Sequence, residues 1–149
     1  MQWLNFYGIA LVAIILVPNI IFAATHKDGF ENLYNNKAAE ILEQVGRFGS
    51  FILMCIQIPA LCGGFAFPEA KALYLCFGFG FVALYCIGWA VFWKESSVRK
   101  ALALSIIPSA MFISCGILSL NFPLLAAALI FAPAHITISY KNAVLSNRQ

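Results

Sequence analysis

Charged residues are scarce in this chain of 149 residues. They make up 10% of it, whereas 62% of the residues are hydrophobic, and a typical soluble domain is about 25% charged. A soluble core of this size cannot hide so much apolar surface, so the composition excludes an ordinary soluble domain and indicates lipid as the solvent. The Lys and Arg residues are also scattered, so nucleic acid is not an expected partner. We therefore predict a multi-pass membrane protein of the plasma or inner membrane, whose main partner is the lipid bilayer.

The sequence motifs of common catalytic and cofactor sites are also missing. The chain has no glycine-rich nucleotide loop, no zinc-binding pattern and no nucleophile elbow. It has two histidines, His26 and His135, and neither has a metal-ligating residue one helical turn further along the chain. We therefore expect no metal site and no cofactor, and the sequence identifies no catalytic residue.

The cysteines do not form a redox motif. None of the five belongs to a C-x-x-C pair, and all lie in apolar runs, which favours a role as small buried side chains. Cys62 and Cys76 fall near the same ends of consecutive apolar segments. A disulfide between them stays open, because the sequence cannot supply the geometry that such a bond needs.

Five apolar segments are long enough to cross a bilayer as helices, at about 1.5 Å per residue. By residue number they are 3–24, 48–67, 72–93, 101–120 and 122–140. The first segment is longer than the core of a secretory signal and has no Lys or Arg before it, so we predict that it is retained. The fold class is therefore all-α, with 1–149 forming one five-transmembrane-helix bundle.

The segment between the first two spans, 26–47, is predicted to be partly helical. It contains strong helix formers after Asn35 and Asn36, either of which could cap a helix that begins outside the membrane and runs into it. At the other end of the chain, the tight connection at Asn121 and Pro123 predicts that the last two spans form an antiparallel hairpin.

Lys and Arg are divided unequally between the two ends of this bundle. One side holds eight of them, in the segments 26–47 and 94–100 and in the C-terminal tail, whereas the other side holds only Lys71. Short cytoplasmic loops carry an excess of Lys and Arg. The N-terminus is therefore predicted to lie outside and the C-terminus in the cytoplasm.

Polar residues recur at helical spacing along the second helix. They are Asn36, Glu40, Glu43, Arg47, Ser50 and Gln57. Steps of three, four or seven residues place them on one face. Glu43 and Arg47 can pair along the helix, and the amide of Gln57 should face another helix because an unsatisfied amide is unfavourable in lipid. The alternative for Glu43 and Arg47 is a solvated amphipathic start to the helix, with Arg47 reaching lipid phosphates.

Two other helices carry polar groups at a similar depth. In the fifth span His135 and Ser139 share a face, next to Pro133, which cannot donate a backbone hydrogen bond. In the first span Asn19 lies, like His135, about 8–10 Å from the cytoplasmic end by helix rise. The third span has almost no titratable groups and is predicted to serve packing or lipid contact. The candidate ligand-binding residues are Asn19, Glu43, Arg47, Gln57, His135 and Ser139.

Three hypotheses for function follow. The first, which we favour, is binding or translocation of a small molecule or ion through a polar cavity open to the cytoplasm, since intramembrane polar groups should face water or each other. A complete path would then need a homo-oligomer or a partner subunit. The second is an accessory or structural subunit whose polar residues hold helices together. The third is a lipid-modifying enzyme at the inner leaflet, with His135 or Glu43 as general base and Arg47 on a lipid phosphate.

Overall fold

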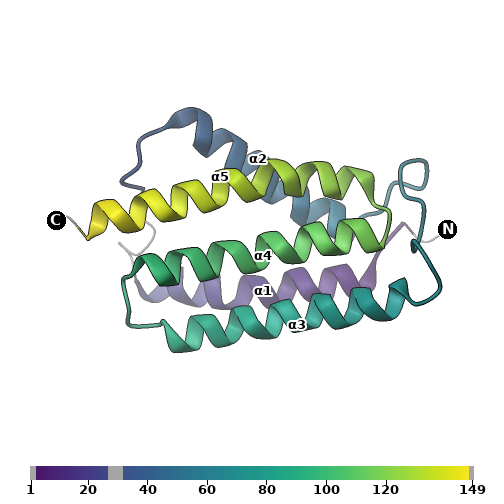
Figure 1. Ribbon diagram of the computed structural model, residues 1–149, viewed down its shortest axis with the longest axis horizontal. Coiled ribbons are helices and arrows are strands. Elements are labelled where there is room, and N and C mark those ends of the chain that lie inside the picture. The colour runs from purple at the N-terminus through teal and green to yellow at the C-terminus, as the bar shows by residue number, and fades with distance from the viewer. Residues whose placement is uncertain (1–2, 27–31, 148–149) are drawn as a thin grey trace.

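Five α-helices lie side by side in the computed structural model, which describes residues 3–26 and 32–147. They are α1 (Phe6–Thr25), α2 (Lys37–Cys55), α3 (Ala70–Val91), α4 (Val98–Leu118) and α5 (Phe122–Ser146). Helices α1, α3 and α5 run in one direction and α2 and α4 in the other (Figure 1). One end of the bundle therefore holds Trp3 and the connection 56–69, and the opposite end holds the end of α5. The predicted all-α class is confirmed.

Asparagine or serine side chains begin four of these helices. In each case the side chain accepts a hydrogen bond from the backbone N–H three residues further along, which satisfies one of the unpaired donors of the first turn. The capping residues are Asn5, Asn36, Ser97 and Asn121. Asn36 is one of the two predicted caps of the second helix, and α2 begins directly after it, at Lys37.

Four helices, α1, α3, α4 and α5, are long and apolar enough to cross a membrane. Their bounds lie within a few residues of the predicted spans, except that α5 continues past residue 140 to Ser146. These four helices support the prediction of a multi-pass membrane protein.

Helix α2 occupies only the first part of the predicted segment 48–67. It ends at Cys55, and residues 56–67 are not helical. Pro59 removes a backbone donor from this stretch. It is followed by Gly63 and Gly64, and glycine is a poor helix former. The carbonyl of Cys55 accepts a hydrogen bond from the backbone N–H of Asn5 at 2.8 Å, so α1 satisfies a group that a longer helix would have used. Helix α2 also differs from the other four helices in composition, because it has four charged residues from Lys37 to Arg47.

The outer surface of α2 is nevertheless apolar. Five large side chains on it are each more than half exposed: Ile41, Leu42, Val45, Phe48 and Ile52. The residues that α2 buries are small or polar for the most part, namely Glu43, Gly46, Ser50 and Met54. This pattern is the reverse of an amphipathic helix on a soluble protein, which turns its apolar face inward. It is the arrangement expected of a helix whose outer face meets lipid.

Glycine allows α2 and α5 to meet at their backbones. A Cβ atom added to Gly46 would lie 2.6 Å from the backbone nitrogen of Phe131. One turn further along α2, Gly49 faces the methyl group of Ala127 and Ser50 is fully buried. Small residues at a helix interface are the usual means of close packing in membranes. The contact also brings the side chain of Glu43, three residues before Gly46, against α5.

Replacing Gly46 with alanine should therefore destabilise the bundle. We expect a loss of about 1–3 kcal/mol in the free energy of unfolding, because the added methyl group overpacks a backbone contact. The matched control is Gly80→Ala on α3, where an added Cβ would have nothing within 4 Å. Alanine is the better helix former, so this control should be neutral or slightly stabilising. Thermal unfolding in detergent, followed by circular dichroism, measures both; equal effects would contradict the close α2–α5 contact.

Candidate functional site

A buried carboxylate joins α2 to α5. One oxygen of Glu43, Oε1, accepts a hydrogen bond from Nδ1 of His135 at 2.9 Å and another from Nε of Arg47 at 2.9 Å. Nη2 of Arg47 contacts the same oxygen. An ionised carboxylate can only accept hydrogen bonds, so Nδ1 of His135 carries the proton in this pair. We refer to Arg47, Glu43 and His135 as the Glu43 cluster.

Packing orients the imidazole ring of His135. Phe131, one turn earlier on α5, stacks on it with ring centroids 4.6 Å apart and planes 18° from parallel. Phe131 is itself held against the backbone of Gly46 and meets the ring of Phe112 edge-on, at a centroid distance of 6.0 Å. The stacking and the bond to Glu43 together limit rotation of the ring. Its second nitrogen, Nε2, makes no hydrogen bond to the described residues.

The three side chains of the Glu43 cluster differ in exposure. Glu43 is 6% exposed, His135 is 21% exposed and Arg47 is 41% exposed. A carboxylate buried to this degree is stable only when donors compensate its charge, and here two side chains do so. Glu43 is therefore not part of a solvated helix start, whereas Arg47 stays accessible. The cluster can offer the guanidinium of Arg47 and Nε2 of His135 to a ligand.

Asn19 does not join the Glu43 cluster. Its Nδ2 donates to the carbonyl of Ile15 at 2.9 Å, and its Oδ1 accepts from the hydroxyl of Tyr85 at 2.9 Å. It therefore links α1 to α3 rather than to α5.

The remaining two candidates lie apart from the carboxylate. Gln57 follows the end of α2 at the opposite end of the bundle, where its backbone N–H donates to the carbonyl of Trp3 at 2.9 Å. The prediction that one helical stripe continues to Gln57 is wrong, because the helix ends at Cys55. Ser139 lies one turn beyond His135 on α5 and is half-buried. The structure thus brings together three of the six predicted residues.

Sequence reasoning missed the polar role of α3, which was predicted to serve only packing or lipid contact. Tyr74 and Tyr85 are both buried, and their hydroxyls bond the amides of Asn5 and Asn19. A signal was present in the spacing. The residues that α3 buries in its middle follow steps of three or four: Tyr74, Gly78, Val82, Tyr85 and Trp89.

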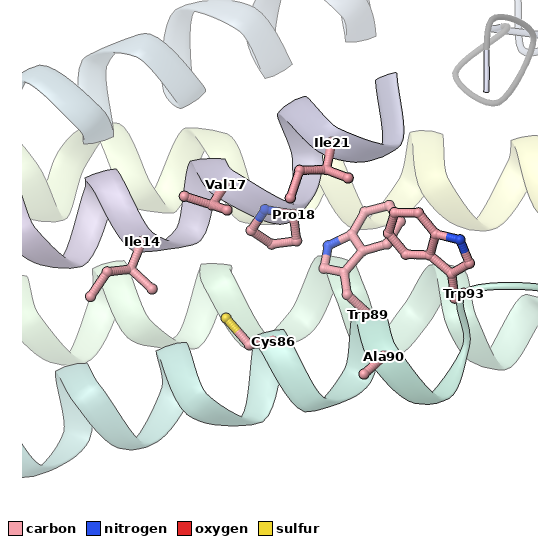
Figure 2. Close-up of a pocket in the computed structure, with 8 residues that line it drawn as sticks. All are labelled: Ile14, Val17, Pro18, Ile21, Cys86, Trp89, Ala90 and Trp93. Carbon is pink, nitrogen blue, oxygen red and sulfur yellow. The ribbon is translucent and has the colours of Figure 1, made fainter. Parts of the chain in front are cut away.

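Two hollows lie outside the Glu43 cluster. One is a groove between α1 and α3, and Figure 2 shows its lining. The other lies over the outer face of α2, at Glu40, Ile41, Gln44 and Val45. Neither contains any of the six predicted residues.

The cysteines and the potential metal ligands do not form a further site. All five cysteines are free, so Cys62 and Cys76 are not paired in this structure. Across residues 3–26 and 32–147, no three His, Cys, Asp or Glu side chains are close enough to hold a metal ion. No family model, curated protein or solved structure matches the chain.

Removing the charge of Glu43 should destabilise the bundle through this cluster. In Glu43→Gln we expect the free energy of unfolding to fall by about 1–3 kcal/mol, because Arg47 and His135 lose a charged acceptor. The control is Glu95→Gln, which removes the same charge from an exposed position between α3 and α4 and should change stability by less than about 0.5 kcal/mol. Chemical unfolding in mixed micelles compares the two variants. Similar losses would mean that the cluster contributes no stability.

Proposed function

We propose that this chain is a five-span membrane protein that binds or translocates a small molecule or ion at the Glu43 cluster, reached from the cytoplasmic side. One observation carries the proposal: a carboxylate that is 6% exposed bonds a guanidinium that is 41% exposed and an imidazole that is 21% exposed. Ionisable groups within a membrane bundle are unfavourable, and they usually mark a pathway or a ligand site. The cluster keeps a cationic donor, the guanidinium of Arg47, and an acceptor, Nε2 of His135, for such a ligand.

The length and outer face of α2 support its role as a fifth span. Its 19 residues cover about 28 Å by helix rise, close to the roughly 30 Å of a bilayer's hydrocarbon core. Near its start, the backbone N–H of Tyr34 donates to the side chain of Asn142 on α5 at 2.8 Å. At its end, Cys55 bonds Asn5 beside α1. Helix α2 therefore extends between the same two ends as its apolar neighbours, and the carboxylate of Glu43 faces inward.

The distribution of basic residues supports the orientation. Lys37, Lys94 and Lys141 lie at the end of the bundle where α1, α3 and α5 finish, whereas Lys71 lies at the other end. The positive-inside rule then places the end with more lysines in the cytoplasm. Glu43 lies six residues into α2, or about 9 Å from that end by helix rise. Five helices are few for a complete path across the membrane, so translocation would require a second copy or a partner subunit.

The geometry of His135 favours a second candidate, a lipid-modifying enzyme. Glu43 holds Nδ1 and leaves Nε2 of His135 facing away from it, which is how a carboxylate orients a histidine general base. Arg47 is accessible enough to contact a lipid phosphate, although Glu43 already occupies two of its nitrogens. The accessory-subunit hypothesis needs neither an exposed Arg47 nor an unoccupied Nε2.

Aqueous access to the cluster tests the binding proposal. In a variant whose native cysteines are replaced, Ser139→Cys places a thiol one turn from His135 and leaves the cluster intact. We expect a membrane-impermeant maleimide to label it only after the cytoplasmic side is opened. Lys141→Cys should behave in the same way, whereas Lys71→Cys should react in intact cells.

The lipid-facing control is Ile87→Cys, whose native side chain is 57% exposed on the outside of α3. It should react poorly from either side. If Ser139→Cys is as unreactive as Ile87→Cys, the cluster is dry and the accessory-subunit hypothesis replaces ours. Labelling of Lys141→Cys in intact cells would reverse the proposed orientation.

Turnover separates the enzyme from the binding protein. If His135 is a general base, His135→Gln should lower the rate of phospholipid conversion by about 10²-fold or more, while Ser139→Ala keeps it. The measurement is product formation from labelled bilayer phospholipids by the purified protein. Equal rates in His135→Gln and the unmodified protein would exclude this role for His135.

A further inference from the structure

A groove of about 340 Å³ runs along the outside of α1 and α3. Its lining is almost wholly apolar and consists of Ile14, Val17, Pro18, Ile21, Cys86, Trp89, Ala90 and Trp93. Figure 2 shows Ile14 at one end of the groove and the two indole rings near Ile21 at the other. Small side chains on α3, Cys86 and Ala90, leave room opposite the branched residues of α1. The volume lies within the range of about 300–1,000 Å³ that is usual for small-molecule sites.

Lys100 and His26 contact the aromatic residues at and beside the tryptophan end of this groove. The ammonium of Lys100, from the start of α4, is 4.6 Å from the centroid of the Phe22 ring and 5.2 Å from that of Trp89. His26 stacks on Phe22 at 4.4 Å and meets Trp93 edge-on at 5.6 Å. Two of the rings that line the groove are thus in contact with a lysine or a histidine.

Lys100 does not form an ion pair with a carboxylate of the described residues. The described residues give it no salt bridge, and the carboxylate that acts on it, Glu95, lies beyond ion-pair distance. Lys94 and Arg99, at the same end of the bundle, are exposed. An anion beside Lys100 would therefore meet a positive charge that the described residues leave unpaired, and Glu95 as the opposing charge, with Lys94 and Arg99 at the same end of the bundle.

We infer that the groove binds an anionic phospholipid of the bilayer, with an acyl chain along α1 and α3 and the phosphate at Lys100 and His26. The groove from Ile14 to Ile21 is about 10 Å long by helix rise, which fits within one leaflet of a hydrocarbon core about 30 Å thick. Trp89 and Trp93 then lie at the headgroup level, where tryptophan is enriched. Lys100 supplies the charge complementarity that distinguishes this groove from general lipid contact. The inference does not depend on the Glu43 cluster, which lies between other helices.

Fluorescence quenching by brominated lipids tests this inference. The chain has three tryptophans. Trp3, which does not line the groove, is replaced in Trp3→Phe so that emission comes from Trp89 and Trp93. The protein is placed in vesicles of phosphatidylcholine that contain a small fraction of either phosphatidylglycerol or phosphatidylcholine brominated on the acyl chain. We expect about fivefold stronger apparent binding of the anionic lipid, the contribution of one lysine near a membrane surface.

Three further variants separate a built site from general lipid contact. Lys100→Gln should abolish the preference for the anionic lipid, and Lys100→Arg should retain it. Ala90→Phe, which fills the groove, should weaken quenching by the anionic lipid, whereas Ala72→Phe adds the same ring at an exposed position near the start of α3 and should not. Equal quenching by the two lipids, an unchanged preference in Lys100→Gln, or equal effects of the two phenylalanine variants would each overturn the inference.

Discussion

The backbone contact between α2 and α5 at Gly46 is the constraint on which the polar interior of this protein depends. Any side chain at Gly46 would displace Phe131, so the two helices approach closely only because this position has none. The approach carries Glu43 of one helix to His135 of the other, and it presses Phe131 against the imidazole ring. Without it, the carboxylate would lack its donor on α5, and a buried charge with one donor fewer is markedly less stable. The same approach of α2 to α5 therefore produces both the packing at Gly46 and the Glu43–His135 hydrogen bond.

If α2 spans the bilayer as proposed, this contact explains how it can bury a carboxylate while its outer face meets lipid. Its outer surface is mostly apolar from Ile41 to Ile52, with Gln44 as a polar exception, while Glu43 and Ser50 face inward. In water such a helix would expose large apolar side chains and bury a carboxylate, and both are unfavourable. In lipid the exposure of the apolar side chains becomes favourable. The buried carboxylate is compensated by hydrogen bonds from Arg47 and His135. The same logic applies to Asn19 and Asn5, whose amides are satisfied by tyrosine hydroxyls of α3.

Much of this architecture could be predicted from the sequence, because helix length, hydropathy and capping are local properties. The four apolar helices, the cap at Asn36 and the Glu43–Arg47 pair are examples of such local features. The end of α2 could not be predicted, since Cys55 and Leu53 find donors on Asn5 and Asn121, which are distant in sequence. Which candidate residues meet could not be predicted from local sequence either. Helix rise placed Asn19 and His135 at the same depth, but depth does not say which neighbouring helix each residue faces. The role of Gly46 in the contact between α2 and α5 is seen only in the packing.

The two ends of the bundle differ in how completely their polar groups are used. At the end near Trp3, hydrogen bonds between segments satisfy backbone groups of Asn5, Gln57, Gly63 and Leu53. At the other end, Arg47 is half exposed, Nε2 of His135 makes no bond to the described residues, and Lys100 lies on aromatic rings rather than on a carboxylate. Polar groups without a hydrogen-bond partner are unfavourable in a bundle unless water or a ligand meets them. If both proposals hold, a solute at the Glu43 cluster and a lipid phosphate beside Lys100 would both arrive from the same, basic end, at different pairs of helices.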